Sequence, residues 1–199
     1  MKISGMILSG GMSRRMGSDK SLKKINNKKL VKLVLDKVSK QVDYAFINSN
    51  KLTKKNININ IDIIKDCLEG HLGPLVGILT GIKWLNKKKG FNFLVSFPVD
   101  SPFFPDDLVS RFQKYSENYD IIIANSKNRN HPVFSMWNLN LEKELEQSIK
   151  NGVRKIEDFT RKKKTKVVKF TNIEYDPFFN INTADDLKFA EKHLIGKIS

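Results

Sequence analysis

Apolar and polar positions follow one another along this chain in blocks that predict strands and helices in turn. Short apolar runs bounded by glycine, proline or asparagine predict strands, and longer stretches with apolar residues three or four positions apart predict helices. We expect strands at residues 3–8, 45–47, 59–64, 91–97, 121–124, 133–137 and 167–170. We expect helices at residues 30–41, 75–85, 105–115, 139–149 and 183 to about 194.

Strands that alternate with helices predict a mostly parallel sheet joined by right-handed crossovers. The strand at 91–97 is apolar on both of its faces, which is typical of a central strand covered on two sides. The sequence contains no internal repeat and no linker, so we expect one domain over residues 1–199. The predicted fold is a Rossmann-like three-layer α/β/α sandwich, whose sheet binds ligands at the carboxyl ends of its strands.

Two of the expected helices begin with a recognisable signal. Pro74 precedes the helix at 75–85, where a missing backbone N–H is tolerated. Thr183 is followed three positions later by Asp186, a spacing that is typical of reciprocal capping at a helix start. These signals fix where the loops before both helices end.

The composition is that of a chain able to bury a core, because 40% of its 199 residues are hydrophobic. Cys67 is the single cysteine, which excludes an intrachain disulfide framework and a multi-cysteine zinc site. No apolar run approaches the roughly 20 residues that span a membrane, and the N-terminus lacks a signal-peptide pattern. We therefore expect a cytoplasmic protein that does not bind membranes.

The formal net charge of +15 raises the question of a nucleic-acid partner. The lysines lie in short scattered clusters, and no known DNA-binding motif or aromatic RNA-binding pattern accompanies them. We therefore expect no nucleic-acid function. A positive surface would instead attract polyanionic small molecules or an acidic partner protein.

The most informative segment, at residues 7–20, reads ILSGGMSRRMGSDK and follows the first expected strand directly. Gly10 and Gly11 let the backbone approach a ligand and point N–H groups toward it. Arg15 and Lys20 are placed to neutralise a triphosphate. The spacing fits neither of the commonest phosphate loops, because Lys20 does not follow a glycine directly. The segment nevertheless predicts a loop that holds a nucleotide.

Polar residues also follow three other expected strands. Asn48 ends the second strand, and its amide can donate to and accept from a base or a ribose. Asp66 comes directly after the strand at 59–64, and Asp100 follows the central strand between two prolines that hold the turn rigid. A carboxylate in the position of Asp100 can bind Mg²⁺ through oxygen.

The second half of the chain adds weaker signals. Asn180 and Asn182 alternate, so in an extended segment both side chains point to one face. His131 precedes a proline and is a candidate contact for a phosphate or an acceptor. Each of these residues also has a purely structural interpretation, as part of a strand end, a cap or a loop.

The order of residues in 7–20 resembles the signature of nucleotidyltransferases, and it is most similar to that of molybdenum cofactor guanylyltransferases, the MobA-like family. Further resemblances are the aspartate that precedes Gly-Pro-Leu-x-Gly in 66–77, the Asp-Ser-Pro step at 100–102 and Asn-x-Asn-Thr at 180–183. They follow the family's order from about residue 7 to residue 187. Ser9 stands where alanine is more usual, and Val99 stands where cysteine is often found.

The resemblance implies a role for each candidate residue. Those that would act in catalysis are Arg15, Lys20 and Asp100. Those that would bind GTP are Leu8, Ser9, Gly10, Gly11, Lys20, Asn48, Asp66 and Asp100. Mg²⁺ would be held by Asp100, helped by Asn180 or Asn182, and the acceptor side would include His131, Asn180 and Asn182.

The implied reaction is the transfer of GMP from GTP to the terminal phosphate of molybdenum-molybdopterin, with release of pyrophosphate. The chain is expected to act as a monomer and to meet molybdenum-insertion proteins and molybdoenzyme chaperones. One alternative is another small nucleotidyltransferase that uses CTP or another nucleotide and a sugar- or polyol-phosphate acceptor. A second is a basic binding module without catalytic activity.

Overall fold

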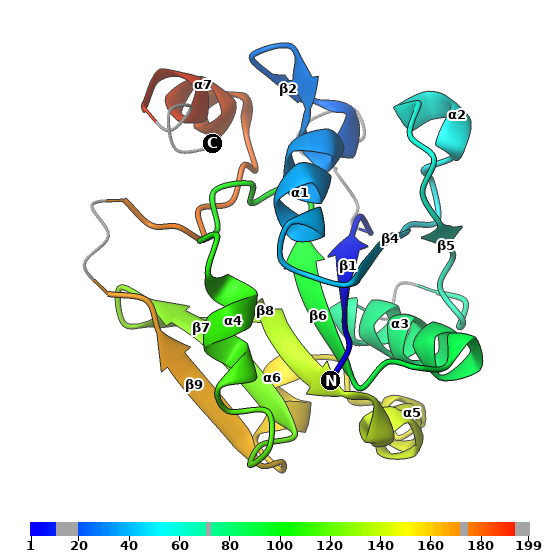
Figure 1. Cartoon of the computed structure of the whole chain (residues 1–199). Coiled ribbons are helices and arrows are strands. Elements are labelled where there is room, and N and C mark those ends of the chain that lie inside the picture. Colours follow the sequence, from blue (N-terminus) through cyan, green and yellow to red (C-terminus); the bar gives the residue numbers. More distant parts are fainter. Residues whose placement is uncertain (11–19, 71–72, 172–174, 194–199) are drawn as a thin grey trace.

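The structure is a computed structural model that describes residues 1–10, 20–70, 73–171 and 175–193 (Figure 1). Its centre is a seven-stranded sheet in the order β5-β4-β1-β6-β8-β7-β9. The strands are β1 (Ile3–Leu8), β4 (Tyr44–Asn48), β5 (Ile63–Ile64), β6 (Phe93–Pro98), β7 (Ile121–Ser126), β8 (Arg129–Asn138) and β9 (Thr165–Lys169). Strand β8 is antiparallel to both of its neighbours, and every other pairing in this sheet is parallel. The prediction of a mostly parallel sheet is therefore confirmed.

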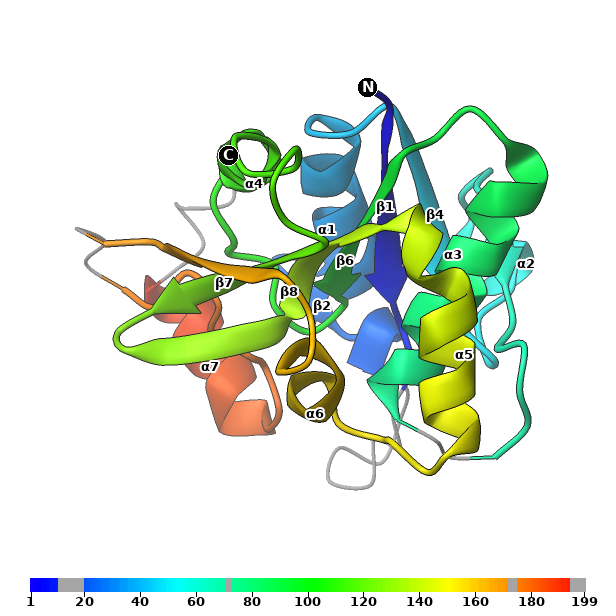
Figure 2. The same ribbon diagram turned by 90° about the horizontal axis from the view of Figure 1, so that it is seen from below.

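Helices cover both faces of the sheet, as expected for a three-layer sandwich (Figure 2). One face carries α1 (Leu30–Ser39) and α4 (Leu108–Gln113), whose apolar residues share a core with Ile7 and Phe97. The other face carries α3 (Pro74–Lys88), α5 (Glu142–Lys150) and α6 (Ile156–Thr160), which pack with Met6 and Trp137. Alternate residues of each strand thus pack into two separate cores, which is why the strands are apolar on both faces.

Beyond the carboxyl ends of the strands lie smaller elements that surround the expected site (Figure 1). They are a 3₁₀ turn η1 (Lys20–Leu22), a hairpin of β2 (Lys24–Ile25) and β3 (Lys28–Lys29), α2 (Lys54–Ile57) and α7 (Ala184–His193). A third apolar cluster joins the hairpin, the start of α1 and the C-terminal segment through Ile25, Leu30 and Ile181. This cluster fixes the C-terminal segment over the edge of the sheet where the site was predicted.

Several short elements differ from the predictions. The strand expected at 59–64 forms only at Ile63–Ile64, where it pairs with Ile47 and Asn48 of β4. Before it lies the unpredicted α2, which starts at a capping box of Thr53 and Asn56 and ends at Asn58 in a left-handed conformation. The hairpin β2–β3 was not predicted. Its turn uses Asn26 and Asn27 at φ values of 47° and 64°, the left-handed pair that a two-residue hairpin turn needs.

The remaining boundaries agree with the expectations to within a few residues. The stretch expected as one helix at 139–149 divides into a 3₁₀ turn η2 (Leu139–Leu141) and α5, and α6 was not predicted. Helix α7 begins as its capping signal predicts: the Thr183 hydroxyl accepts from the N–H of Asp186, and the Asp186 carboxylate accepts from the N–H of Thr183. The expected end of this helix at residue 194 falls outside the described residues.

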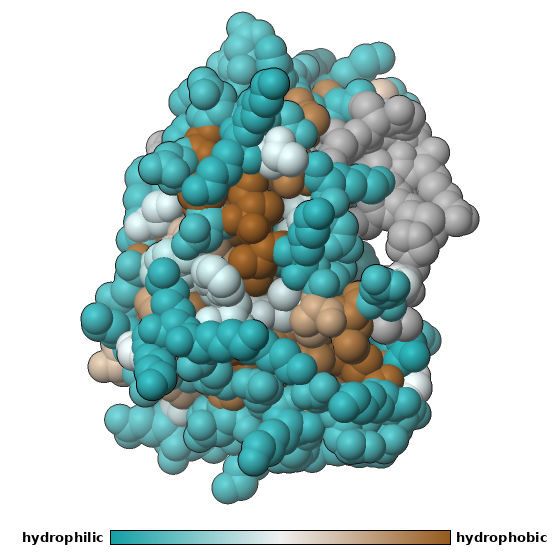
Figure 3. Space-filling view, turned by 90° about the vertical axis from the view of Figure 1, so that its right-hand side faces the viewer, coloured by the Kyte–Doolittle hydropathy of each residue, from teal (hydrophilic) through white to brown (hydrophobic). Residues whose placement is uncertain are grey.

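The side of the molecule that carries α2, β5 and α3 is mostly hydrophilic, with apolar patches between the polar residues (Figure 3). Half-buried isoleucines at this edge, Ile59, Ile61 and Ile63, pack against the core that lies under α1. Within the part of the chain that the structure describes, no helix has both the length and the apolar character needed to cross a membrane.

Candidate active site

The carboxyl ends of four neighbouring strands bring the first group of predicted residues to one edge of the sheet. In the register of the sheet, Leu8 at the end of β1 lies between Asn48 of β4 and Pro98 of β6. Hydrogen bonds continue past the strand ends, from Ser9 N–H to the Asn48 carbonyl at 2.9 Å and from Val99 N–H to the Leu8 carbonyl at 3.1 Å. The loop that begins at Ser9 therefore leaves the sheet between Asn48 and Asp100.

Asp66 is held at this edge by two asparagine amides. One of its carboxylate oxygens accepts from Asn48 Nδ2 at 2.9 Å, and the other accepts from Asn50 Nδ2 at 2.8 Å. The Asp66 N–H in turn donates to Asn50 Oδ1 at 2.9 Å. Asn48 is buried and Asp66 is half-buried, so the two amides orient a carboxylate that is still partly accessible to solvent. The structure thus brings Asn48 and Asp66, each predicted as a site residue, into direct contact, and Asn50 adds a contact that was not predicted.

Gly77 in the first turns of α3 lets this helix approach the same network closely. A Cβ at position 77 would lie 2.5 Å from Leu8 Cδ2 and 2.6 Å from Asn48 Oδ1, so only glycine fits without displacing them. Gly73, at the N-cap of α3, has a φ of 81°, which also favours glycine. The glycines of the Gly-Pro-Leu-x-Gly element thus shape the floor of the site.

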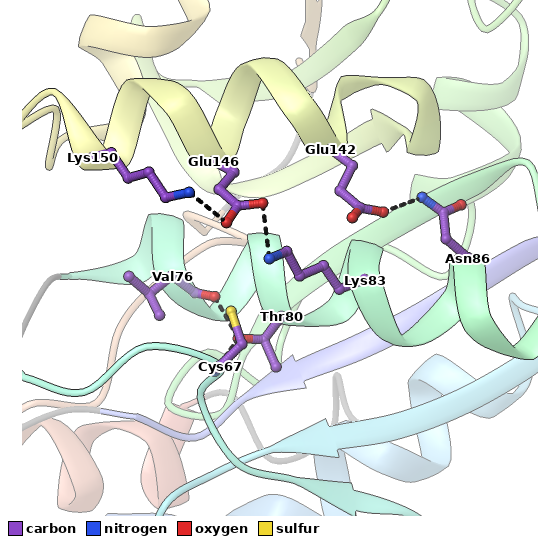
Figure 4. Close-up of polar contacts among 8 residues, drawn as sticks. All are labelled: Cys67, Val76, Thr80, Lys83, Asn86, Glu142, Glu146 and Lys150. Atoms are coloured by element: carbon purple, nitrogen blue, oxygen red, sulfur yellow. Dashed lines mark hydrogen bonds and ion pairs between the residues drawn. The ribbon is translucent and has the colours of Figure 1, made fainter.

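The segment after Asp66 is fastened to α3, and α3 is fastened to α5 (Figure 4). Cys67 N–H donates to the Thr80 hydroxyl at 2.9 Å, and that hydroxyl donates to the Val76 carbonyl at 2.7 Å. On the next turn Lys83 pairs with Glu146 of α5 at 2.9 Å. This pair raises the pKa of the Lys83 ammonium and lowers that of the Glu146 carboxyl. Both contacts stabilise the position of the helix that forms the floor.

Asp100 and Asn180 meet although they are far apart in the sequence. Ser101 Oγ lies 3.4 Å from Asp100 Oδ1 and 2.8 Å from Asn180 Oδ1. The N–H of Ile181 donates to the Asp100 carbonyl at 2.8 Å, and the buried Ile181 side chain anchors the segment in the third apolar cluster. The structure therefore places an aspartate carboxylate and an asparagine amide oxygen together at the carboxyl end of β6, as the family resemblance implied.

Asn182 lies at the beginning of α7, where its N–H donates to Asp186 Oδ2 at 2.8 Å. This contact belongs to the cap of the helix, and an additional role of the Asn182 side chain toward a metal or an acceptor remains a prediction.

His131 occupies a buried position beside the carboxyl end of β7. Its Nε2 is 2.9 Å from the Ser126 hydroxyl, which donates to Asp176 Oδ1 at 2.8 Å. Because that hydroxyl has a single proton, Nε2–H of His131 must be the donor in their bond. Burial lowers the pKa of His131 below its ordinary value of 6.5, and the charge of Asp176 opposes this shift. The order differs from a nucleophilic triad, since the serine rather than the histidine lies in the middle.

Ser126 and Asp176 were not predicted as members of the site. They are 50 positions apart, and neither belongs to a short motif, so only the tertiary structure brings them together. Asp176 Oδ1 also accepts from the N–H of Phe178 at 3.0 Å, and the Phe178 ring lies 4.7 Å from the His131 ring between centroids. The network therefore fixes the segment that leads to Asn180.

The nucleotide loop itself is only partly covered by the described residues. Gly11 and Arg15 lie outside them, and of Lys20 only its backbone position at the start of η1 is described. Ser9 and Gly10 are described at the entrance of the loop. The Ser9 hydroxyl is buried and has no hydrogen-bond partner in the structure of the described residues.

The donor set at Asp100 fits Mg²⁺ but would not hold it alone. Carboxylate and amide oxygens are hard ligands, which this ion prefers, and nucleotide sites commonly supply one or two carboxylates and leave the remaining positions to phosphates and water. Within the described residues, no three or more histidine, cysteine, aspartate or glutamate side chains form a group that could hold a metal. A bound nucleotide would therefore have to complete the coordination.

Comparisons with known proteins agree with this geometry. The sequence profile of the MobA-like NTP transferase domain matches residues 5–166. Molybdenum cofactor guanylyltransferases from Rhodopseudomonas palustris (strain BisB5) and Rhizobium leguminosarum bv. trifolii (strain WSM2304) are 33% and 36% identical to the chain. These matches cover 94% and 97% of the chain, and 91% and 93% of the relatives.

Solved structures show the same fold. Molybdopterin-guanine dinucleotide biosynthesis protein A from Archaeoglobus fulgidus has a TM-score of 0.77 and 26% identity, and the match covers 95% of this chain and 97% of that one. A 4-diphosphocytidyl-2C-methyl-D-erythritol synthase from Anaerococcus prevotii has a TM-score of 0.73 with 15% identity, over 97% and 96% of the two chains. The second likeness supports the fold alone.

Proposed function

The chain belongs to the MobA-like NTP transferase family, and from this premise we propose that it transfers GMP from GTP to the terminal phosphate of molybdenum-molybdopterin. The observation that carries the proposal is the identity of 33% and 36% with molybdenum cofactor guanylyltransferases over nearly the whole chain. The contact of Asp100 and Asn180 through Ser101, at the centre of the carboxyl edge, supports a metal-assisted reaction at a phosphate, which this transfer requires.

The chemistry requires no protein nucleophile. An oxygen of the acceptor phosphate, already anionic near neutral pH, forms a bond to the α-phosphorus of GTP. The bond from that phosphorus to the bridging oxygen of the β-phosphate breaks, and pyrophosphate leaves with the electron pair. The protein's contribution is to position the two phosphates and to stabilise the charge of the transition state.

Asp100, with Asn180 beside it and Asn182 as a further candidate, would hold Mg²⁺ at the reacting phosphate. Bound there, Mg²⁺ would act as a Lewis acid that withdraws charge from the phosphate oxygens. Ser101 keeps Asn180 in place by donating to its amide oxygen. Arg15 and Lys20 of the loop would stabilise the charge that develops on the departing pyrophosphate.

The nucleoside would lie over the ends of β1, β4 and β5. Asp66 offers to the guanine and ribose a carboxylate that the buried Asn48 amide orients, and Gly77 allows the helix to approach Asn48 closely. The residues proposed to line this half of the site are Leu8, Ser9, Gly10, Gly11, Lys20, Asn48 and Asp66. On the acceptor side we propose His131, Asn180 and Asn182, with His131 acting through Ser126 and the segment that carries Asn180.

Further proposals follow from the same family membership. We propose one nucleotidyltransferase domain over residues 1–199, a monomer, and a cytoplasmic location. Partners would be molybdenum-insertion proteins and molybdoenzyme chaperones, to which a chain with a net charge of +15 could present a positive surface.

The test is a nucleotide panel. The purified chain would be incubated with molybdenum-molybdopterin, Mg²⁺ and GTP, ATP, CTP or UTP in turn, and pyrophosphate release would be measured. We expect release with GTP that depends on both the acceptor and Mg²⁺. Release with CTP alone would favour another small nucleotidyltransferase. No release with any nucleotide, together with no nucleotide-induced rise in melting temperature, would favour a non-catalytic module. A ligand at about a hundred times Kd adds roughly 2.7 kcal/mol, which gives a rise of several degrees.

A further inference from the structure

One backbone N–H beside Asp66 is fixed by a residue that lies in none of the motifs discussed above. Thr80, on the second turn of α3, accepts a hydrogen bond from Cys67 N–H at 2.9 Å (Figure 4). Cys67 directly follows Asp66, and its side chain is exposed, so the contact with α3 is made by its backbone. Thr80 therefore holds the main chain at the peptide bond that leaves Asp66.

The hydroxyl of Thr80 is oriented for this contact by its own helix. Thr80 is 5% exposed, and its hydroxyl proton is donated to the Val76 carbonyl at 2.7 Å. This bond to the preceding turn restricts the rotamer of the side chain and leaves the lone pairs of Oγ1 free to accept from Cys67 N–H. Valine has nearly the same shape but could make neither bond. The hydroxyl, and not the shape of the side chain, thus joins α3 to the segment that carries Asp66.

Three hydrogen bonds from the end of β4 also act on Asp66. Asn48 and Asn50 each donate to one carboxylate oxygen, at 2.9 and 2.8 Å, and Asp66 N–H donates to Asn50 Oδ1 at 2.9 Å. Thr80 adds an anchor from α3. With the N–H groups of residues 66 and 67 both engaged, the planar peptide groups on the two sides of the Asp66 Cα are held, and the direction of the side chain is held with them.

The helix that carries this hydroxyl is itself held in place. Its apolar residues pack on the sheet. Lys83, on the next turn, pairs with Glu146 of α5 at 2.9 Å, and Asn86 Nδ2 donates to Glu142 Oε2 at 2.6 Å. Figure 4 shows both contacts on the side of α3 that faces α5. The acceptor for the segment after β5 therefore has a fixed position.

We propose that Thr80 is a positioning residue for the nucleotide and acts through Asp66. Its hydroxyl holds the peptide bond between Asp66 and Cys67, and this keeps the carboxylate in the direction needed to contact the guanine and ribose of GTP. A carboxylate that is fixed before the nucleotide arrives loses less conformational freedom on binding. The inference rests on the proposed function and deepens it, because it adds to the nucleotide half a residue outside every motif that the sequence offered.

The experiment compares the same substitution on two helices. Thr80→Val removes the hydroxyl that accepts from Cys67 N–H. Thr160→Val, on α6, is the matched control, because Thr160 is also 5% exposed and its hydroxyl donates to the Glu157 carbonyl of its own helix at 3.3 Å. Thr80→Ser keeps the hydroxyl and tests for rescue. GTP affinity is measured by isothermal titration calorimetry with Mg²⁺ and without the acceptor, and thermal melting checks that each variant folds.

We expect Thr80→Val to bind GTP about fivefold more weakly than the unmodified chain, and Thr80→Ser and Thr160→Val to bind it within about twofold of the unmodified chain. In guanylyl transfer, Thr80→Val should raise the KM for GTP by a similar factor, with an unchanged kcat and an unchanged KM for the acceptor. If Thr80→Val did not fold, Thr80→Ala and Thr160→Ala would make the same comparison.

A double variant tests whether Thr80 acts through Asp66. Asp66→Ala removes the carboxylate, so the addition of Thr80→Val to it should not weaken GTP binding further. A further loss of similar size in this background, or equal GTP affinity in Thr80→Val and Thr160→Val, would overturn the inference. If the unmodified chain transferred no GMP, the proposed function would fail, whereas transfer that is insensitive to Thr80→Val would remove the positioning role alone.

Discussion

The two halves of the carboxyl edge are built in different ways. In the half formed by β1, β4, β5 and β6, parallel neighbouring strands place Asn48 and Asp66 in direct contact. In the half formed by β7, β8 and β9, one strand is antiparallel, and the contacts join residues as distant as Ser126 and Asp176. Asp100 and Asn180 lie where the halves meet.

The comparison shows that the two halves follow separate physical rules. In the first half, each polar residue comes at the end of its own strand, and parallel pairing alone brings these residues together. In the second half, the returning C-terminal segment must be anchored by Asp176, Phe178 and Ile181 before Asn180 reaches the site. A change in the first half should therefore affect nucleotide binding, and a change in the second should affect the acceptor or the anchoring of this segment.

The largest effect is expected at Asp100, which lies where the two halves meet and is proposed to act on both substrates. Asp100→Ala should lower Mg²⁺-dependent guanylyl transfer by at least ~10³-fold, because it removes the carboxylate proposed to hold the ion. Steady-state kinetics at saturating GTP and acceptor measure this loss. Asp36→Ala, which removes an exposed carboxylate on α1 paired with Lys32, is the control and should leave turnover unchanged. Turnover retained in Asp100→Ala would remove the metal assignment.

A second pair of variants separates packing from nucleotide binding on one helix. In Gly77→Ala the new Cβ would meet Leu8 Cδ2 and Asn48 Oδ1, and in Gly81→Ala it would meet Met6 Sδ at 2.6 Å and Leu94 Cδ2 at 2.9 Å. Both should lower the free energy of unfolding by about 1–3 kcal/mol through overpacking. Only Gly77→Ala should also raise the KM for GTP, by roughly tenfold or more, because it displaces Asn48. Equal KM values for GTP in the two variants would contradict the proposal that Gly77 shapes the nucleotide site.

A third comparison lies within the amide and carboxylate network. Asp66→Ala should raise the KM for GTP by roughly ten- to a hundredfold, since a hydrogen bond to a charged group contributes about 1.5–3 kcal/mol. Asn50→Ala removes one of the two amides that orient this carboxylate and should have a smaller effect in the same direction. The KM for the acceptor should stay the same in both. A change in acceptor KM without a change in GTP KM would reverse the assignment of the two halves.

The smallest effect concerns the buried histidine of the second half. The pKa of His131 is lowered in the folded protein, so the unfolded chain takes up this proton more readily. The stability that the neutral ring contributes is fully present above pH 6.5 and is lost as the pH falls below that value. The melting temperature of the unmodified chain should therefore fall more steeply on acidification than that of His131→Gln. One proton sets a limit of about 1.4 kcal/mol per pH unit, and identical pH profiles would contradict the burial argument.

The sequence predicts the first half of the molecule better than the second. The strand at 3–8, the helix after Pro74 and the turn at Asp100 were located by apolar runs and turn residues, because these signals are local. Short elements were not predicted where side-chain caps or a two-residue turn stabilise them, as in α2 and the hairpin at Asn26 and Asn27.

The same distinction applies to the site. Asn48, Asp66 and Asp100 could be selected because each comes at the end of an apolar run, and Asn180 because it alternates with Asn182. Ser126 and Asp176 could not be selected, since they come together only when the C-terminal segment folds back beside β7 and β8.

The most direct test of the central claim is a mass measurement of the reaction product. GTP, Mg²⁺ and molybdenum-molybdopterin would be incubated with the chain, and with Asp100→Ala as the blank, and the acceptor would then be analysed by mass spectrometry. We predict an acceptor heavier by one guanylyl group, together with an equal amount of pyrophosphate, and neither product in the blank. An acceptor of unchanged mass, or one that carries a cytidylyl group when CTP replaces GTP, would contradict the account.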